Sequence, residues 1–294
     1  MSLTSTPSLR ALLDRPEPVV APGVFDALSA HLAAQAGFQA LYLSGASISY
    51  TRLGRPDIGL VGMSEVAETV GLIRGRVDLP LMVDADTGYG NALNVGRTVR
   101  TFERAGAAAI QLEDQVLPKR CGHMAGKQLV STAEMVGKLQ AALDARDAAD
   151  TMIVARTDGI AVEGFEAGLA RAEAYLEAGA DMLFLEAPQT PEQLRSIGAQ
   201  FSGRTVLMAN MVEGGRTPMM AADRLAELGF GFVIFPGGLI RALVSAGQDY
   251  LASLKAHGTT APFRDRMLDF DALNQVLGLD EVLAAGARYE PGED

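Results

Sequence analysis

The segment that decides the fold is "LPLMVDADTGYGNALNVGRTVRTFERAGAAAIQLED", residues 79–114. It starts with an apolar run over 79–86, continues with a helical pattern over 95–106 and ends with a second apolar run over 107–114. The helical part closes in Ala-Gly, a common signal for the C-terminus of a helix. Two strands joined by a helix run parallel, so the segment predicts a parallel sheet covered by helices.

The same strand–helix unit recurs along the chain. The other strand-like runs cover residues 18–23, 40–46, 151–158, 181–187, 205–211 and 231–237. One of the helical patterns between them, "SEVAETVGLIRG", has Ser64 as its expected N-cap. Eight such units favour a closed barrel over an open, doubly wound sheet. We therefore predict an α/β protein with a (β/α)₈ TIM-type barrel over residues 1–248 and a C-terminal helical extension over residues 249–294.

Composition and charge exclude several classes of protein. The 294 residues carry a formal net charge of −11, which argues against a nucleic-acid partner because such partners need a basic face. No apolar run approaches the roughly 20 residues that cross a bilayer, and the N-terminus lacks the pattern of a secretory signal. A single cysteine permits no internal disulfide and fits a reducing compartment. The expected location is the cytoplasm.

Polar residues follow the apolar strands at their carboxyl ends, where barrel enzymes carry their catalytic groups. Burying these groups without partners is costly, so they should converge on one another, on a metal or on a ligand. These residues are Ser44, Asp84, Asp86, Glu113, Asp114, Arg156, Glu186 and Asn210.

Three of the carboxylates suggest a metal site. Asp84 and Asp86 are two positions apart, so on a strand their side chains share one face, and Glu113 ends the next strand. Converging carboxylates repel unless a cation joins them, and Mg²⁺ or Mn²⁺ suits such oxygen ligands. The alternative is that Asp86 opens the turn "DTGYGN" and only caps backbone amides. The stretch "GYGNAL" lacks the third glycine of a dinucleotide-binding loop.

The only cysteine lies in "KRCGHMAGK", residues 119–127, which we name the cysteine loop. Lys119 and Arg120 precede Cys121, and Gly122 and His123 follow it. Neighbouring cations lower the pKa of a thiol, so Cys121 is predicted to be reactive rather than a core residue. His123 is predicted to act in acid–base chemistry or positioning, with a structural hydrogen bond as the alternative.

Several separated motifs together resemble the isocitrate lyase/phosphoenolpyruvate mutase superfamily. In chain order they are "SGAS", "VDADTGYGN", "IQLEDQ", "KRCGH", "VARTD", "LFLEA" and "NMVEGG". The cysteine loop is similar to that of the carbon–carbon lyase branch, because the mutases and phosphonate hydrolases lack it. The short chain excludes the isocitrate lyases with their inserted domain. Lyases of 2-alkylmalates, lyases of 2-methylisocitrate and oxaloacetate hydrolases remain.

The resemblance implies a mechanism and a role for each residue. A 2-hydroxy acid binds to Mg²⁺, loses its hydroxyl proton and breaks its C2–C3 bond, and the departing enediolate is protonated by Cys121. Asp84, Asp86 and Glu113 hold the metal directly or through water, and Asp84 also touches the substrate. Lys119, Arg120, Gly122 and His123 share a gating loop with Cys121. The keto-acid end is held by Ser44, Gly45, Ala46 and Arg156, and the departing fragment faces Glu186, Asn210, Gly214 and Gly215.

Two departures from the family pattern bear on the substrate. Ala46 and Ser47 stand where 2-methylisocitrate lyases carry more glycine, and "NMVEGG" over 210–215 is closer to the 2-alkylmalate lyases. Glu213 would oppose a third substrate carboxylate, despite the nearby Arg216. The sequence therefore favours a 2-alkylmalate such as 2,3-dimethylmalate, cleaved to pyruvate and a carboxylate. The alternatives are 2-methylisocitrate, oxaloacetate, and an inactive barrel that only binds a small dicarboxylate.

The resemblance also implies an assembly. The helical tail after Gln248 is the element expected to be exchanged between subunits of a homotetramer. A small-molecule 2-hydroxy di- or tricarboxylate is the expected partner, with no membrane or nucleic acid involved.

Overall fold

The computed structural model describes residues 6–122 and 124–289. Eight parallel strands pair in chain order, and β8 pairs with β1 to close the barrel. This confirms the predicted (β/α)₈ fold. The strands are β1 (Val19–Val24), β2 (Leu41–Leu43), β3 (Leu81–Asp84), β4 (Ala109–Glu113), β5 (Met152–Thr157), β6 (Met182–Leu185), β7 (Val206–Asn210) and β8 (Phe230–Phe235).

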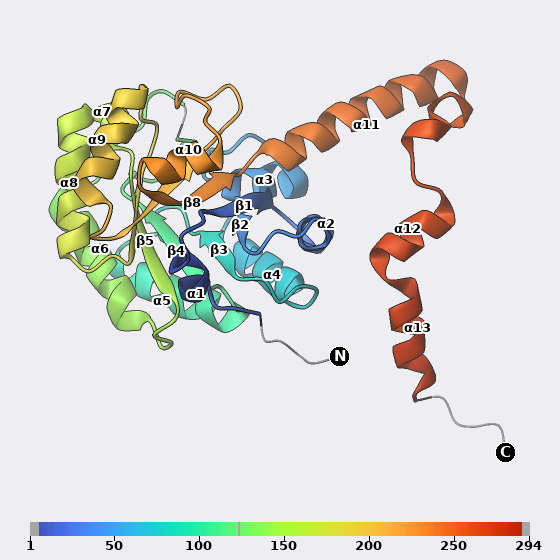
Figure 1. The fold of residues 1–294 in the computed structure, drawn as a ribbon, viewed down its shortest axis with the longest axis horizontal. Helices are drawn as coiled ribbons and strands as arrows, with labels where there is room; N and C mark the ends of the chain where they lie inside the picture. Colours follow the sequence, from blue (N-terminus) through green and yellow to red (C-terminus); the bar gives the residue numbers. More distant parts are fainter. Residues whose placement is uncertain (1–5, 123, 290–294) are drawn as a thin grey trace. The chain divides into compact units, whose positions relative to one another are not determined.

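Helices surround this ring of strands (Figure 1). Those of the barrel are α1 (Leu9–Leu13), α2 (Ala27–Gln35), α3 (Gly45–Ile48), the π-helix η1 (Ser49–Leu53), α4 (Met63–Arg74), α5 (Ala92–Ala105), α6 (Thr132–Ala145), α7 (Gly159–Val162), α8 (Phe165–Glu177), α9 (Pro191–Phe201) and α10 (Ala222–Glu227). The expected N-cap at Ser64 is wrong. Helix α4 is capped at Gly62, whose N–H donates to the Glu65 carboxylate at 2.7 Å, so Ser64 lies inside the first turn.

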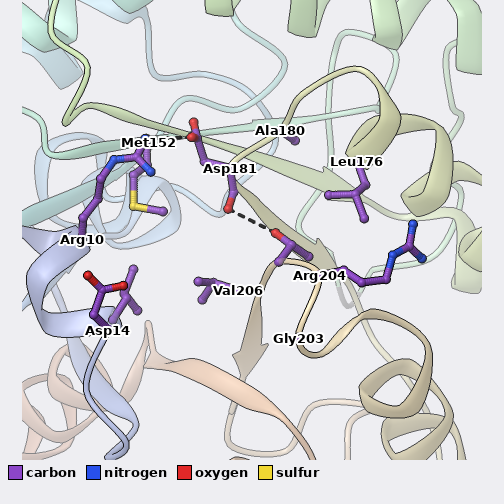
Figure 2. Close-up of a pocket in the computed structure, with 11 residues that line it drawn as sticks. Arg10, Asp14, Met152, Leu176, Ala180, Asp181, Gly203, Arg204 and Val206 are labelled. Carbon is purple, nitrogen blue, oxygen red and sulfur yellow. Dashed lines mark hydrogen bonds and ion pairs between the residues drawn. The ribbon is translucent and has the colours of Figure 1, made fainter.

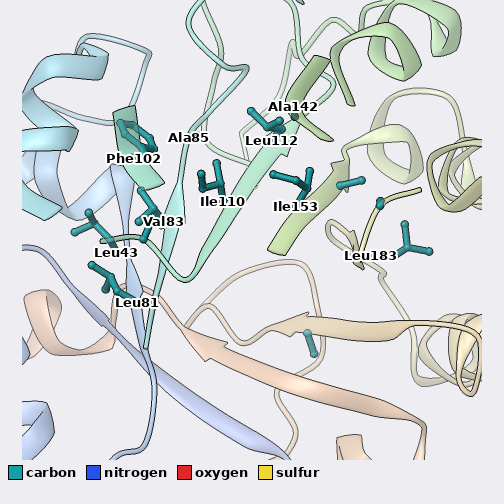
Figure 3. Packing of buried hydrophobic residues seen from close by; sticks show 14 of the residues in the cluster. Leu43, Leu81, Val83, Ala85, Phe102, Ile110, Leu112, Ala142, Ile153 and Leu183 are labelled. Carbon is teal, nitrogen blue, oxygen red and sulfur yellow. The ribbon is translucent and has the colours of Figure 1, made fainter. Parts of the chain in front are cut away.

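Strand alternation builds two hydrophobic cores. Side chains that point outward, such as Val83 and Ile110, pack with the helices in one cluster, to which Phe102 of α5 belongs (Figure 3). Side chains that point inward, such as Met82 and Phe184, fill the barrel in the second cluster. Successive residues of a strand face opposite sides, so the alternation of inward and outward side chains continues to the carboxyl ends of the strands. It decides which polar residues enter the site.

Helix α1 belongs to the inner core. Leu9 and Leu12 are buried in the same cluster as the inward-facing residues of the strands. The guanidinium of Arg10 pairs with Asp181 at 2.7 Å, and Arg146 pairs with the other carboxylate oxygen of Asp181 at 2.7 Å. Asp181 precedes β6, so these contacts fasten α1 to the end of the barrel where the strands begin.

The chain divides into two compact units, residues 1–240 and 241–294. The division falls within α11 (Gly238–His257), and the predicted boundary after residue 248 lies in the same helix. The second unit continues with the 3₁₀ helix η2 (Ala261–Arg266), α12 (Phe270–Leu277) and α13 (Leu279–Ala287). Gly278, in the left-handed conformation with φ of 78°, ends α12 and begins α13. Over the described ranges, no helix has both the length and the hydrophobicity needed to cross a membrane.

Candidate active site at the carboxyl end of the barrel

Alternate side chains of each strand point into the barrel, so several polar residues meet at its carboxyl end. We name this group of residues the mouth. Arg156 lies 3.0 Å from Glu113 and 3.6 Å from Glu186, and Asn210 donates to Glu186 at 3.1 Å. A Cβ built on Gly45, next to Ser44, would lie 3.4 Å from Asp84, so the start of α3 closes this group. The predicted convergence therefore holds for the mouth residues, which are Ser44, Asp84, Glu113, Arg156, Glu186 and Asn210.

Asp114 was expected at this end of the barrel as well, but it does not face the mouth. It follows Glu113 directly, so it points outward, where Tyr175 and Thr157 donate to its carboxylate at 2.8 and 2.7 Å. Arg171 of α8 lies 3.3 Å from the same oxygen. Asp114 therefore joins β4 and β5 to α8 and has a structural role.

Arg156 is the central cation of the mouth. Its Nε donates to Asp158 at 3.0 Å, and its guanidinium lies 5.3 Å from the ring centre of Phe184. Burial by itself lowers the pKa of an arginine, but here the charges of Asp158, Glu113 and Glu186 outweigh burial and raise the pKa of Arg156 well above its usual value. A permanently charged, planar group in this place suits a substrate carboxylate.

Two acids near Arg156, Asp86 and Glu113, have pKa values raised above the ordinary range. Asp86 has a φ of 47°, uncommon for a non-glycine residue, and its N–H donates to Asp84 at 3.2 Å. Burial raises the pKa of Asp86 to about 7, although the charge of Lys119 opposes this rise. Burial also raises the pKa of Glu113 well above its ordinary value, against the charge of Arg156. These acids hold their negative charge only if cations lie close to them.

The mouth has an excess of negative charge. Among the described residues, the mouth and the charged groups paired around it contain six carboxyl groups (Asp57, Asp84, Asp86, Glu113, Asp158 and Glu186) and three cations (Lys119, Lys127 and Arg156). One oxygen of Glu113, Oε1, is buried without a hydrogen-bond partner among the described residues. A dianionic substrate would add to the imbalance, so a further cation fits this site.

The positions of the side chains decide how many of them can bind such a cation directly. Among residues 6–122 and 124–289, no three Asp, Glu, His or Cys side chains come close enough together to hold a metal ion by themselves. Asp86 is already 2.7 Å from the ammonium of Lys119. Asp84, Asp86 and Glu113 therefore do not form a closed three-ligand site. They suit Mg²⁺, which commonly takes one or two carboxylates and fills its other positions with water and substrate oxygens.

The cysteine loop is fastened to the mouth through Lys119. The buried ammonium of Lys119 lies 2.6 Å from Asp57 and 2.7 Å from Asp86. Burial lowers the pKa of Lys119, but the charges of Asp86, Asp57 and Glu113 outweigh it and raise the pKa well above the usual value. Sequence reasoning missed Asp57, because it lies in a loop after η1 and no strand pattern points to it.

Arg120 has a different position in the same loop. It is exposed, its guanidinium donates to the carbonyl oxygen of Ala125 at 3.0 Å, and its backbone N–H donates to Gln115 at 2.9 Å. Gln115 returns a bond to the Arg120 carbonyl oxygen at 2.9 Å. Arg120 thus braces the loop in this structure, and its predicted catalytic role stays a prediction.

Cys121 is partly exposed and directly precedes Gly122, where the loop packs tightly against the mouth. A Cβ built on Gly122 would lie 2.6 Å from Arg156 Nη2 and 2.7 Å from Glu186 Cγ. A side chain at this position would force the loop or these two mouth residues to shift, so the loop backbone packs directly on Arg156 and Glu186 next to Cys121. His123, expected to act with Cys121, lies outside the described residues.

The "VEGG" turn is less closely tied to the mouth. Glu213 and Gly214 are exposed and Gly215 is half-buried, and Glu213 lies beside Gly238 at the start of α11. Arg216 lines a cavity of about 250 Å³ together with Met124 and Lys127 of the cysteine loop. The predicted contacts of Gly214 and Gly215 with a departing fragment therefore stay predictions.

A cavity of about 540 Å³ lies at the opposite end of the barrel, and Figure 2 shows residues that line it. It is lined by residues at the starts of strands, such as Met152 and Val206, and by Arg10, Asp181 and Arg204. Both arginines are already paired, Arg10 with Asp181 and Arg204 with Glu173. Since the catalytic groups of barrel enzymes lie at the carboxyl end, this cavity is not the candidate site.

Comparisons with known proteins agree with this geometry. The family described as phosphoenolpyruvate phosphomutase matches residues 9–255. A 2,3-dimethylmalate lyase of Eubacterium barkeri is 43% identical over 290 residues, which are 99% of this chain and 100% of the relative. A 2-methylisocitrate lyase of Aeropyrum pernix is 48% identical over 259 residues, covering 88% of this chain and 82% of the relative.

Solved structures lead to the same family. The crystal structure of a 2,3-dimethylmalate lyase, described as a PEP mutase/isocitrate lyase superfamily member, has a TM-score of 0.90 and 38% identity, covering 97% of this chain and 96% of that chain. A phosphonopyruvate hydrolase in complex with oxalate and Mg²⁺ has a TM-score of 0.86 and 32% identity, covering 96% and 97%. The resemblance inferred from the motifs is confirmed, and this chain belongs to the phosphoenolpyruvate mutase/isocitrate lyase superfamily.

Proposed function

We propose that this protein is a Mg²⁺-dependent carbon–carbon lyase that cleaves a 2-alkylmalate, such as 2,3-dimethylmalate, into pyruvate and a simple carboxylate. The observation that carries the proposal is the contact of Gly122 with Arg156 and Glu186. Gly122 directly follows the partly exposed Cys121, so this contact supports a role for the thiol near the buried Arg156 and Glu186. The similar 2,3-dimethylmalate lyase, aligned over nearly the whole chain, supports the same reaction.

The keto-acid half of the substrate is held by Arg156 together with the start of α3. The guanidinium binds one carboxylate, and Ser44, Gly45 and Ala46 line the adjoining wall. Mg²⁺, when bound beside Asp84, Asp86 and Glu113, polarises the 2-hydroxyl group and stabilises negative charge that develops on its oxygen. The Mg²⁺ in the similar phosphonopyruvate hydrolase supports this assignment, and Mn²⁺ offers the same chemistry.

Cleavage breaks the C2–C3 bond and transfers its two electrons to the departing fragment. A general base accepts the proton of the 2-hydroxyl, the electrons of that O–H bond form the keto group of pyruvate, and the C2–C3 electrons pass to the departing fragment as its enediolate. The resulting enediolate carries its charge near Lys119, which is held beside Asp86 at 2.7 Å. The Cys121 thiol then donates its proton to the enediolate carbon. In the condensation direction the thiolate takes that proton back.

The remaining predicted residues surround the departing fragment. We assign this side of the site to Glu186, Asn210, Gly214 and Gly215, with Arg120 and His123 in the loop that covers it. Because Glu213 is acidic and exposed, a third substrate carboxylate would gain little there. This favours a 2-alkylmalate over 2-methylisocitrate.

One substrate panel tests the function. Purified protein with Mg²⁺ receives 2,3-dimethylmalate, 2-methylmalate, 2-methylisocitrate or oxaloacetate, and pyruvate and oxalate are measured separately. The expected outcome is pyruvate from both alkylmalates with the highest kcat/KM. If 2-methylisocitrate exceeds every alkylmalate by about tenfold, a gap of roughly 1.4 kcal/mol in transition-state binding, the substrate class is wrong. If no substrate turns over and Mg²⁺ with oxalate does not bind, the chain is an inactive barrel.

We further propose a homotetramer in which the C-terminal helices are exchanged between subunits. Phe270, Leu273 and Leu277 lie on one face of α12 and are 81%, 46% and 43% exposed. On α13, Val282 and Leu283 are likewise exposed. A second copy of this chain is the natural cover for apolar faces of this size. The proposed location is the cytoplasm, where a reactive free thiol stays reduced.

A further inference from the structure

A buried lysine outside the predicted site ties the cysteine loop to the barrel. Lys127 is the last residue of the loop, and its side chain is 2% exposed. Its ammonium donates to the carbonyl oxygen of Gly122, the residue after Cys121. It also donates to the carboxylate of Asp158 at 2.5 Å. One ammonium therefore joins the middle of the loop to the segment that follows β5.

Asp158 connects this lysine to the substrate arginine. Its side chain is fully buried, and its second oxygen accepts from Arg156 Nε at 3.0 Å. Its backbone N–H donates to Asp114 at 3.0 Å, which fixes the carboxylate to the outer layer of the barrel. Asp158 thus holds Arg156 on one side and Lys127 on the other. The loop position and the arginine orientation depend on one carboxylate.

The other attachments of the cysteine loop to the barrel lie before Cys121. Lys119 fastens its first residue, and Gln115 binds the backbone of Arg120. Between Cys121 and the end of the loop, Lys127 supplies the only ion pair to the barrel among the described residues. Without it, Gly122 would rest on Arg156 and Glu186 through packing alone.

We propose that Lys127 is a positioning residue for the lyase reaction, and that its pairing with Asp158 holds Cys121 over Arg156. The lyase part of this inference rests on the proposed function, whereas the loop part does not. A cation buried between a carbonyl oxygen and a carboxylate has fixed geometry, because losing either partner would leave a buried charge unpaired. Loop closure would then favour proton delivery by keeping the thiol near the enediolate carbon.

The test uses the only cysteine of the chain as a reporter. Iodoacetamide alkylation of Cys121 is followed by intact mass across the thiol titration, with and without Mg²⁺ and oxalate. The limiting rate at high pH is compared, so that a changed thiol pKa does not enter the comparison. The variants are Lys127→Met and Lys127→Gln. Arg195→Met is the control, because it removes a cation from an exposed position on α9.

We expect Lys127→Met to raise the limiting alkylation rate about tenfold and to lower kcat by a similar factor, with a smaller change in KM. Lys127→Gln, which can still donate to Gly122, should fall between Lys127→Met and the wild type. Arg195→Met should match the wild type. An alkylation rate within about twofold of the wild type in a folded Lys127→Met protein would overturn the inference.

The remaining outcomes are also decisive. If both Lys127 variants unfold, the lysine is a folding element of the barrel and the positioning role is wrong. If the wild type cleaves no substrate yet Lys127→Met still exposes the thiol, the proposed function fails and the loop attachment stands.

Discussion

The backbone of Gly122 lies against the guanidinium of Arg156. A Cβ at Gly122 would come within 2.6 Å of Arg156 Nη2, closer than real Cβ atoms approach. The residue that follows Cys121 is thus in direct contact with the group proposed to bind the substrate carboxylate. Any side chain at position 122 must move the loop, the arginine or both.

Gly122→Ala should therefore lower kcat/KM by about tenfold or more, because the thiol moves away from the substrate. The control is Gly137→Ala in α6, where a Cβ would meet nothing within 4 Å and alanine favours the helix. Steady-state kinetics and thermal denaturation of both variants check this prediction. Wild-type kinetics in Gly122→Ala would mean that the loop contact is not needed for turnover.

Cys121→Ser should keep the fold and the binding of Mg²⁺ with oxalate but lose cleavage by about 100-fold or more. A serine hydroxyl is a far weaker acid than a thiol, and proton donation of this kind contributes about 10²–10⁴ to a rate. Kinetics are measured beside calorimetric titration of the metal. More than about a tenth of the wild-type kcat in this variant would rule out Cys121 as the proton donor.

Asp84→Asn should weaken Mg²⁺ binding in the presence of oxalate by about tenfold or more, since a neutral amide is a poorer ligand for a hard cation. Asparagine keeps the shape and can still accept the 3.2 Å bond from Gln111. Glu192→Gln, on the exposed start of α9, is the control. Equal Mg²⁺ affinity in wild type and Asp84→Asn would remove Asp84 from the proposed metal site.

Leu273→Asp combined with Val282→Asp should convert the proposed tetramer into smaller species, because buried interface positions tolerate no unpaired charge. Both side chains are exposed in the single chain, so the fold of the barrel should not change. Multi-angle light scattering measures the mass. Gln275→Asp adds one negative charge, half that of the double variant, at an exposed polar position of α12 and should leave the assembly intact. A wild-type chain that is already monomeric would contradict the exchange of helices.

Glu103→Gln should show a pH-dependent loss of stability. Burial raises the pKa of Glu103, but the hydrogen bonds from the N–H groups of Asp147 and Ala148, at 2.9 and 2.8 Å, together outweigh it and lower the pKa below the ordinary 4.5. A depressed pKa stabilises the folded state above the unfolded pKa, and this stability disappears as the pH falls through the folded pKa.

Since Glu103 is partly exposed and solvent screens its charge, the effect should be only about 0.5 kcal/mol at neutral pH, or about 1 °C in Tm. The Tm difference between wild type and Glu103→Gln should stay constant above about pH 4.5 and shrink as the pH falls below it through the folded pKa. Glu17→Gln, at an exposed position before β1, is the control. A difference that is independent of pH would mean that the carboxylate charge does not stabilise the bond to the α6–β5 connection.

The fold was predictable because its signals are local. All eight apolar runs became strands, and the alternation of side chains in each strand decides the two faces. The same rule brought Asp84, Glu113 and Arg156 to one side, and applied strictly it would also have turned Asp114 outward. The N-cap of α4 was misplaced because a side chain three residues on, Glu65, serves a glycine cap there.

The sequence by itself therefore determined the barrel, its family and the inward groups at the ends of its strands. Only the tertiary structure decided the contacts between loops and strands, namely Lys119 between Asp57 and Asp86, and Lys127 between Gly122 and Asp158. No periodicity relates these residues, since loops have no repeating geometry. Their pairing depends on closure of the barrel, which brings distant segments together and leaves buried charges that must pair with one another.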